Sequence, residues 1–193
     1  MLPGFVDRGP VVGADEIAAF EERCGYRLPA DYRAFLLAQN GGARSLPAHM
    51  EDDATENWTQ RMVRTPRFYS LGAAAAAGFT VAEALEQLSL IGHFEDWMEL
   101  EAEFPGLLHD LDVKMHICRG DGSHGYYPPE LLPIGTGGYE NLLLLRVDGP
   151  DAGAVFSTWD PDGYCEWHCD REAGSFVEYL QQLNEPPPSG NDP

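Results

Sequence analysis

The stretch that decides the fold is "LPADYRAFLLAQNGG", residues 28–42. Its proline lies near the start of a helix, where a missing backbone N–H costs no hydrogen bond. Tyr32, Phe35 and Leu36 recur at helical spacing and form one apolar face. Residues 40–42, Asn-Gly-Gly, tolerate the left-handed conformation that ends a helix. The stretch therefore predicts a packing helix with both boundaries defined, and it holds no residue with an obvious catalytic role.

A shorter helix is expected just before this one, over about 15–24. Ile17 and Phe20 share one face at helical spacing. Asp15 is suited to the N-cap position, and Gly25 to the stop at the other end. The N-terminal part of the chain is therefore a pair of helices.

Strands dominate the sequence after residue 130. The apolar run 141–147, "NLLLLRV", predicts a central strand, and the preceding "GTGG" predicts a turn into it. A last helix is expected at 175–183, with Ser175 as its N-cap. Further strands are expected at 67–71, 131–135, 154–160 and 164–170. The order of elements predicts an α+β fold with a mainly antiparallel sheet packed against N-terminal and C-terminal helices.

The chain is expected to form a single domain over residues 1–184, followed by a disordered tail at 185–193. Its start lacks the basic end and apolar stretch of a signal peptide. No apolar run approaches the roughly 18 residues that span a bilayer. These features predict a cytoplasmic protein, monomeric or weakly dimeric.

The charge of the chain is strongly negative and unevenly distributed. Thirty-two acidic residues face twelve basic ones, a net charge of −20, and residues 68–193 carry −18 of it. No Lys or Arg occurs from 68 to 113, a stretch that includes helix candidates at 80–88 and 94–104. Such a surface repels nucleic acid and anionic membranes, and it attracts a basic protein partner. The alternative is that the charge serves solubility alone.

Together these segments resemble the SUKH superfamily, which includes fungal cell-wall assembly regulators and many bacterial immunity proteins. The resemblance covers about residues 14–184, and segments 43–67 and 90–128 have no counterpart in it. The "GTGGYEN" run departs from the family pattern, in which Asn follows the glycines directly. The positions that carry the resemblance are Leu28, Pro29, Tyr32, Phe35, Leu36, Asn40, Gly41, Gly42, Pro133, Ile134, Gly135 and Asn141.

The resemblance implies binding rather than catalysis, with no cofactor. Its bacterial members sit beside polymorphic toxins, often basic nucleases, and block them. We therefore expect an immunity protein that neutralises a basic toxin domain by direct binding. The alternative is a regulatory or scaffold protein of the fungal type. An enzyme is a residual hypothesis, because no serine or cysteine of the chain lies in the context of a nucleophile elbow.

The expected partner surface is the base-free acidic stretch, because a row of carboxylates can occupy the positions where a nuclease holds phosphates. Trp58 lies in a polar loop and is a candidate exposed anchor, since aromatic side chains dominate binding energies. The predicted partner-binding residues are Glu95, Asp96, Glu99, Glu101, Glu103, Asp110, Asp112 and Trp58.

The segment "CEWHC", residues 165–169, suggests a zinc site, with Cys118 as a further ligand. In a strand, Cys165 and Cys169 lie roughly 13 Å apart and His168 points to the other face. Two thiolates on one zinc lie within about 4 Å of each other. We therefore expect no metal site, and buried or half-buried thiols instead. "DPDG" at 160–163 lacks the later ligands of a calcium loop and predicts a hairpin turn.

Overall fold

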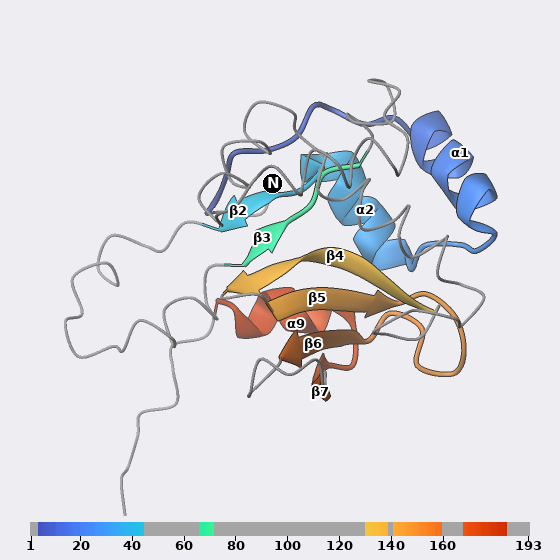
Figure 1. The fold of residues 1–193 in the computed structure, drawn as a ribbon. Helices are drawn as coiled ribbons and strands as arrows, with labels where there is room; N and C mark the ends of the chain where they lie inside the picture. The colour runs from blue at the N-terminus through green and yellow to red at the C-terminus, as the bar shows by residue number, and fades with distance from the viewer. Residues whose placement is uncertain (1–3, 45–65, 72–129, 139–140, 160–167, 185–193) are drawn as a thin grey trace, which may run out of the picture.

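The computed structural model describes residues 4–44, 66–71, 130–138, 141–159 and 168–184. In these ranges the sheet has seven strands in chain order, each antiparallel to its neighbours (Figure 1). The predicted α+β class is confirmed. The described elements are β1 (Phe5–Val6), α1 (Ala14–Cys24), α2 (Ala30–Gln39), β2 (Gly42–Arg44), β3 (Arg67–Phe68), β4 (Leu131–Gly138), β5 (Asn141–Arg146), β6 (Val155–Trp159), β7 (His168–Ala173) and α9 (Phe176–Gln182).

Helices α2 and α9 pack against the same face of the sheet, and aromatic rings fill the contact. The ring of Phe35 on α2 lies 5.2 Å from that of Phe68 on β3 and 5.1 Å from that of Phe176 on α9. Phe5 on β1 lies 5.7 Å from Phe35. These edge-on contacts are the arrangement that aromatic pairs favour. Four elements therefore meet at one aromatic cluster, and Figure 1 shows α9 behind strands β4 to β6.

Strand β5 is the central strand that its apolar run predicts. Leu143 and Leu145 belong to the core between the sheet and the helices. Leu144 points to the opposite face and is also fully buried. A strand buried on both faces needs apolar residues at consecutive positions, which explains the run of four leucines.

Strand β4 is longer than predicted, because "GTGG" belongs to the strand rather than to a turn. Two register shifts in the pairing with β5 accommodate the glycines. At Gly135 a Cβ atom would lie 2.3 Å from the carbonyl oxygen of Arg67. A residue without a side chain is therefore required where β3 approaches β4.

Three strand boundaries differ from the prediction. Only Arg67–Phe68 of the expected strand 67–71 pairs as β3, although the Tyr69 amide still donates to the Ile134 carbonyl at 2.9 Å. β6 begins one residue later than predicted, and residue 160 lies outside the described residues. The predicted end of the last strand at residue 170 was wrong, because β7 continues until Ala173 enters the core opposite Val155. Residues 164–167 of that prediction lie outside the described part of the chain.

The helix ends are capped partly as predicted. Ser175 is the N-cap of α9, and its hydroxyl oxygen accepts from the Glu178 amide at 3.1 Å. Gly25 ends α1 in the left-handed conformation. The N-cap of α1, however, is Gly13 rather than Asp15, and its amide donates to Glu16 at 2.7 Å. Helix α1 therefore starts one residue earlier than expected.

Asn40 joins three separate parts of the chain. Its side-chain amide donates to the carbonyl of Pro10 at 2.6 Å and to that of Leu71 at 3.2 Å. Its side-chain oxygen accepts from the Leu71 amide at 2.7 Å. Asn40 is left-handed, as predicted, with φ of 47°. The residue therefore ends α2 and also fixes the N-terminal segment and the exit from β3.

The two glycines after Asn40 are needed for backbone conformation and for space. Gly41 and Gly42 have φ of 81° and 115°, which L-residues with side chains rarely adopt. A Cβ on Gly41 would lie 2.7 Å from the Tyr69 carbonyl oxygen, and one on Gly42 would lie 2.7 Å from that of Val6. The "NGG" triplet thus lets α2 turn directly into the sheet.

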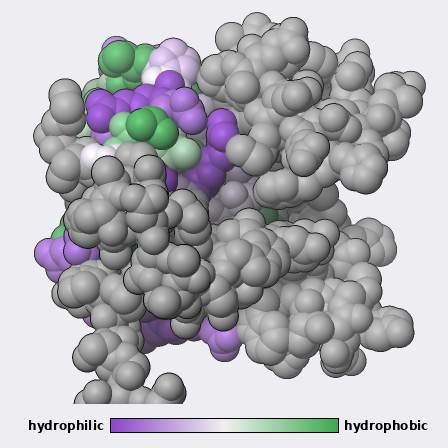
Figure 2. All heavy atoms as spheres, turned by 90° about the vertical axis from the view of Figure 1, so that its left-hand side faces the viewer, coloured by the Kyte–Doolittle hydropathy of each residue, from purple (hydrophilic) through white to green (hydrophobic). Residues whose placement is uncertain are grey.

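The described surface carries scattered apolar side chains. The exposed large apolar residues in the described ranges are Val6, Val11, Leu37 and Val177. On the face shown in Figure 2, green areas are separated by purple ones. Single exposed apolar residues are normal on protein surfaces. In the described ranges no helix is long and apolar enough to cross a membrane.

Replacing Leu36 by alanine is expected to lower the free energy of unfolding by roughly 2–5 kcal/mol, because it leaves a cavity beneath α2. Leu36 is fully buried, and Phe35→Ala should act in the same way. The matched control is Leu37→Ala, whose side chain is 42% exposed and should change stability by less than about 0.5 kcal/mol. Urea unfolding measures all three. A Leu36→Ala protein with the wild-type midpoint would show that α2 does not form the core.

Replacing Asn40 by glycine is expected to lower the free energy of unfolding by roughly 2–4 kcal/mol, since the buried backbone groups of Leu71 and the partly buried carbonyl of Pro10 lose their partner. Glycine keeps the left-handed backbone, so the change isolates the side-chain hydrogen bonds. The control is the reverse exchange, Gly25→Asn, at a left-handed helix end with open space around it. Equal thermal midpoints for Asn40→Gly and the wild type would refute the joining role.

Candidate functional site

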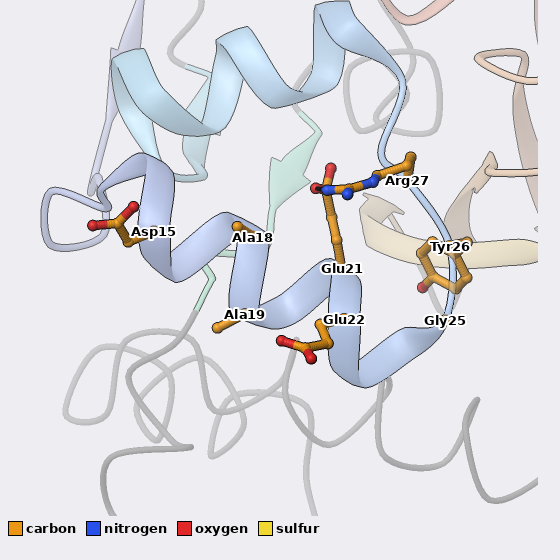
Figure 3. Close-up of a pocket in the computed structure, with 8 residues that line it drawn as sticks. All are labelled: Asp15, Ala18, Ala19, Glu21, Glu22, Gly25, Tyr26 and Arg27. Carbon is orange, nitrogen blue, oxygen red and sulfur yellow. Dashed lines mark hydrogen bonds and ion pairs between the residues drawn. The ribbon is translucent and has the colours of Figure 1, made fainter.

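The described part of the molecule contains a hollow of about 600 Å³ beside α1. Asp15, Ala18, Ala19 and Glu22 recur at helical spacing and share the outer side of the helix. Glu21 of α1 and three residues of the turn after the helix, Gly25, Tyr26 and Arg27, supply the rest. The complete lining, drawn in Figure 3, is Asp15, Ala18, Ala19, Glu21, Glu22, Gly25, Tyr26 and Arg27.

Glu21 is a buried acidic residue at the inner side of the hollow, with its side chain 2% exposed. It accepts from Arg27 at 2.7 Å, from Arg33 at 2.8 Å and from the Leu28 amide at 3.0 Å. Figure 3 shows Glu21 and Arg27 pointing toward each other. A buried carboxylate is stable only with such partners. These contacts tie the end of α1 to the start of α2, and we call them the Glu21 clamp.

The clamp shifts the titration of its carboxylate. Burial alone raises the pKa of Glu21, but the hydrogen bonds from Arg27, the Leu28 amide and Arg33 outweigh it and hold the pKa below its ordinary value. The native state therefore binds the proton less readily than the unfolded chain does. The resulting stability is present above the unfolded pKa, near 4.3, and is lost as pH falls through the lower native pKa.

The charges around α1 differ in how they are used. Glu16 accepts a hydrogen bond from the Gly13 amide at the start of the helix, and Glu21 forms ion pairs with two arginines. The guanidinium of Arg23 lies 5.5 Å from the ring centre of Phe20. Asp15 and Glu22 are exposed beside the hollow. The described lining includes no serine, cysteine or histidine. The lining thus combines the exposed carboxylates of Asp15 and Glu22 with the small side chains of Ala18 and Ala19.

The predicted partner-binding residues belong to parts of the chain that the structure does not describe. Trp58, the acidic residues from Glu95 to Glu103, Asp110 and Asp112 all lie outside the described residues. So do Cys118, Cys165, the "DPDG" turn, the helices expected at 80–88 and 94–104, and the tail at 185–193. Their roles stay predictions.

The family signature is mainly buried. Leu28, Tyr32, Phe35, Leu36 and Ile134 belong to the core. Asn40, Gly41, Gly42, Pro133 and Gly135 are also buried, Pro29 is the N-cap of α2, and Asn141 begins β5. These residues therefore carry the architecture.

The two cysteines that the structure describes agree only partly with the expectation of buried or half-buried thiols. Cys24 is half-buried, but Cys169 is exposed. Among the described residues no group of three or more His, Cys, Asp or Glu side chains is placed to hold a metal ion. Of the proposed zinc ligands, the structure describes only the side chain of Cys169.

Sequence reasoning missed the Glu21 clamp. A signal was present, because Glu21 follows Ile17 and Phe20 on the apolar side of α1, where a charge is unexpected. The two arginines that neutralise it lie six and twelve residues further along the chain. Only the angle between the helices, which the sequence does not give, brings them together.

The Glu21→Gln substitution is expected to lower the free energy of unfolding at pH 7 by roughly 1–3 kcal/mol, because two arginines lose a charged acceptor. Arg27 is 81% exposed and water replaces part of its bond, which keeps the cost below that of a fully buried pair. The difference from wild type should shrink as the pH falls below about 4.3 toward the lower pKa of the native carboxylate, because the unfolded chain takes up the proton first. Urea unfolding at several pH values measures it.

Glu22→Gln is the matched control for that experiment. Glu22 is the next residue of α1, but it is exposed. Its neutralisation should change stability by less than about 0.5 kcal/mol at any pH. A constant difference between Glu21→Gln and wild type from pH 7 to pH 3 would contradict the clamp.

Comparison with known proteins agrees with this architecture. No curated protein matches the chain. The model of the SMI1 / KNR4 family (SUKH-1) matches residues 12–182, which include α1, α2 and α9 as well as strands β2 to β7. The match thus covers most of the sequence and every buried signature position. The chain belongs to the SMI1 / KNR4 (SUKH-1) family.

Proposed function

We propose that this protein is an immunity protein of the SUKH type, which binds a basic, nuclease-type toxin domain and blocks it. The observation that carries the proposal is the distribution of charge. Residues 68–113 carry nine acidic side chains and no basic one, whereas residues 1–67 carry ten acidic and eight basic side chains.

The near-balance of residues 1–67 argues against solubility as the only reason for the charge. Solubility would be served by acids spread over the whole chain, whereas residues 68–193 carry −18 of the total of −20. Several acids elsewhere have structural tasks, such as Glu21 in the clamp and Glu178 on the Gly174 amide. The surplus of acids supports a partner with Lys and Arg side chains.

A regulatory or scaffold role of the cell-wall assembly type is the alternative. The two functions differ in what the neighbouring gene encodes. We expect the protein encoded immediately upstream to end in a basic toxin domain, and co-expression of this chain to protect cells from it. Survival that does not depend on this chain would contradict the proposal.

The acidic stretch is tested by reversing three of its charges, Glu95→Lys, Glu99→Lys and Glu103→Lys together. Association with the upstream-encoded toxin domain should slow roughly tenfold at low salt, since steering depends on opposite charge. Dissociation should change less. Stopped-flow association across a salt series measures both the rate and its salt dependence.

The control makes the same change in net charge outside the acidic stretch, at three exposed acids near the N-terminus. Its substitutions are Asp7→Lys, Asp15→Lys and Glu22→Lys. It should slow association clearly less. Wild-type affinity and salt dependence in the Glu95/Glu99/Glu103 variant would remove the acidic stretch as the binding surface.

A further inference from the structure

Asn40 and Gly41 form the one Asn-Gly pair of the sequence. An asparagine deamidates when the backbone nitrogen of the next residue attacks the Cγ atom of its side chain. Glycine in that next position hinders the attack least, because it carries no side chain. The other asparagines precede larger residues and are Asn57, Asn141, Asn184 and Asn191. The pair that joins α2 to the sheet is therefore also the pair that reacts most readily when the backbone is free to rotate.

The reaction releases ammonia and then consumes water. The nitrogen of Gly41 forms a bond to Cγ of Asn40 while the bond from Cγ to Nδ2 breaks. The amide group leaves as ammonia, taking the proton of the Gly41 N–H, and a five-membered imide ring remains. Water then opens the ring at either of its two carbonyl carbons. The result is aspartate or isoaspartate at position 40.

The folded backbone holds the reacting atoms apart. Asn40 has a ψ of 62°, which places the Gly41 nitrogen anti to the Cβ atom of Asn40. Ring closure needs that nitrogen eclipsed with Cβ, half a turn away about the Cα–C bond. The Asn40 carbonyl accepts from the Gly9 amide at 3.0 Å, so this rotation would break a hydrogen bond. It would also move Gly41, which lies against the backbone of Tyr69 too closely for a side chain.

The side chain of Asn40 is held as firmly as its backbone. Nδ2 donates to the carbonyls of Pro10 and Leu71, and Oδ1 accepts from the Leu71 amide at 2.7 Å. The residue is 1% exposed. These contacts must break before Cγ can meet the Gly41 nitrogen. The reaction therefore requires an opened chain, and its rate follows the population of the open form.

The product does not fit the site in which the asparagine lies. Aspartate keeps an acceptor for the Leu71 amide, but it presents an oxygen instead of a donor to the carbonyls of Pro10 and Leu71. Acceptors that lose their donor in a folded protein destabilise it. Isoaspartate lengthens the main chain by one carbon atom directly before Gly41 and Gly42, where even an added Cβ would clash. Either product is therefore expected to weaken refolding.

We propose that Asn40 is a deamidation site that unfolding opens. The native fold shields it, and a chain that stays unfolded is modified there and does not regain its full stability. A domain of ordinary stability keeps its unfolded fraction below roughly one in a thousand, so the native chain should react at least about 1,000-fold more slowly than the unfolded one. The amide that makes the joint is the group that reacts, so the fold cannot keep one without the other.

The test incubates the full chain in mildly alkaline buffer at a series of urea concentrations and follows position 40 by peptide mapping. Trypsin releases this position in the fragment 34–44, AFLLAQNGGAR, and the same synthetic peptide gives the rate of a free chain. We expect the rate to rise with the unfolded fraction and to reach the peptide rate above the urea midpoint. Asn57 and Asn184 should react more slowly in the unfolded chain. A rate at Asn40 that is independent of urea, or no faster than at those two residues, would overturn the proposal.

Two variants change the unfolded fraction without altering Asn40 or its partners. Leu36→Ala removes a fully buried side chain and should raise the rate in native buffer by roughly 30-fold or more. If this variant does not fold at all, it should react at the peptide rate. Leu37→Ala, at the exposed neighbour, should react at close to the wild-type rate. Equal rates for Leu36→Ala and Leu37→Ala would show that the fold does not shield Asn40.

The loss of refolding is measured on chains that are held in alkaline urea until fragment 34–44 is converted and are then diluted into native buffer. Chains held equally long in mildly acidic urea, where ring closure is slow, should recover the wild-type urea midpoint, and the converted chains should not. The control is Asn40→Gly, which lacks the site and should keep its own midpoint after alkaline urea. A wild-type midpoint in the converted chains, or an equal loss in Asn40→Gly, would overturn the claim that the product does not fit.

Discussion

The side chain of Asn40 is the contact on which the rest of the structure depends. Through one amide group it satisfies the carbonyl of Pro10 and both backbone groups of Leu71, which are buried or partly buried. Those contacts bring Phe5 and Phe68 onto Phe35, so the aromatic cluster forms around a polar joint. Asparagine suits this position because it tolerates the left-handed backbone and has both a donor and an acceptor.

The sequence predicts the elements whose signals are local. The spacing of Tyr32, Phe35 and Leu36 gives α2, the four leucines give β5, and Ser175 gives the start of α9. The sequence does not show that β4 runs on through its glycines. That outcome depends on β3, which lies more than sixty residues earlier and approaches too closely for a side chain.

The candidate site is harder to predict than the fold. The Glu21 clamp depends on how α1 meets α2, because its arginines come from the turn and from the next helix. The acidic stretch is visible in the sequence at once, and it belongs to segments that the family signature leaves aside. Architecture and partner choice thus rest on different residues of the same chain.

The anchoring of the chain on both sides of segment 72–129 has a consequence for the length of that segment. Leu71 is held by Asn40, and the carbonyl of Glu130 accepts from the Val147 amide at 2.8 Å. The entropic cost of holding the two ends of a flexible chain at fixed points rises slowly with its length. It grows by about 0.6 kcal/mol for each doubling. For the 58 residues between these anchors, chain closure alone therefore adds little cost when the length changes. The two anchors therefore constrain where this segment begins and ends more strongly than how long it is.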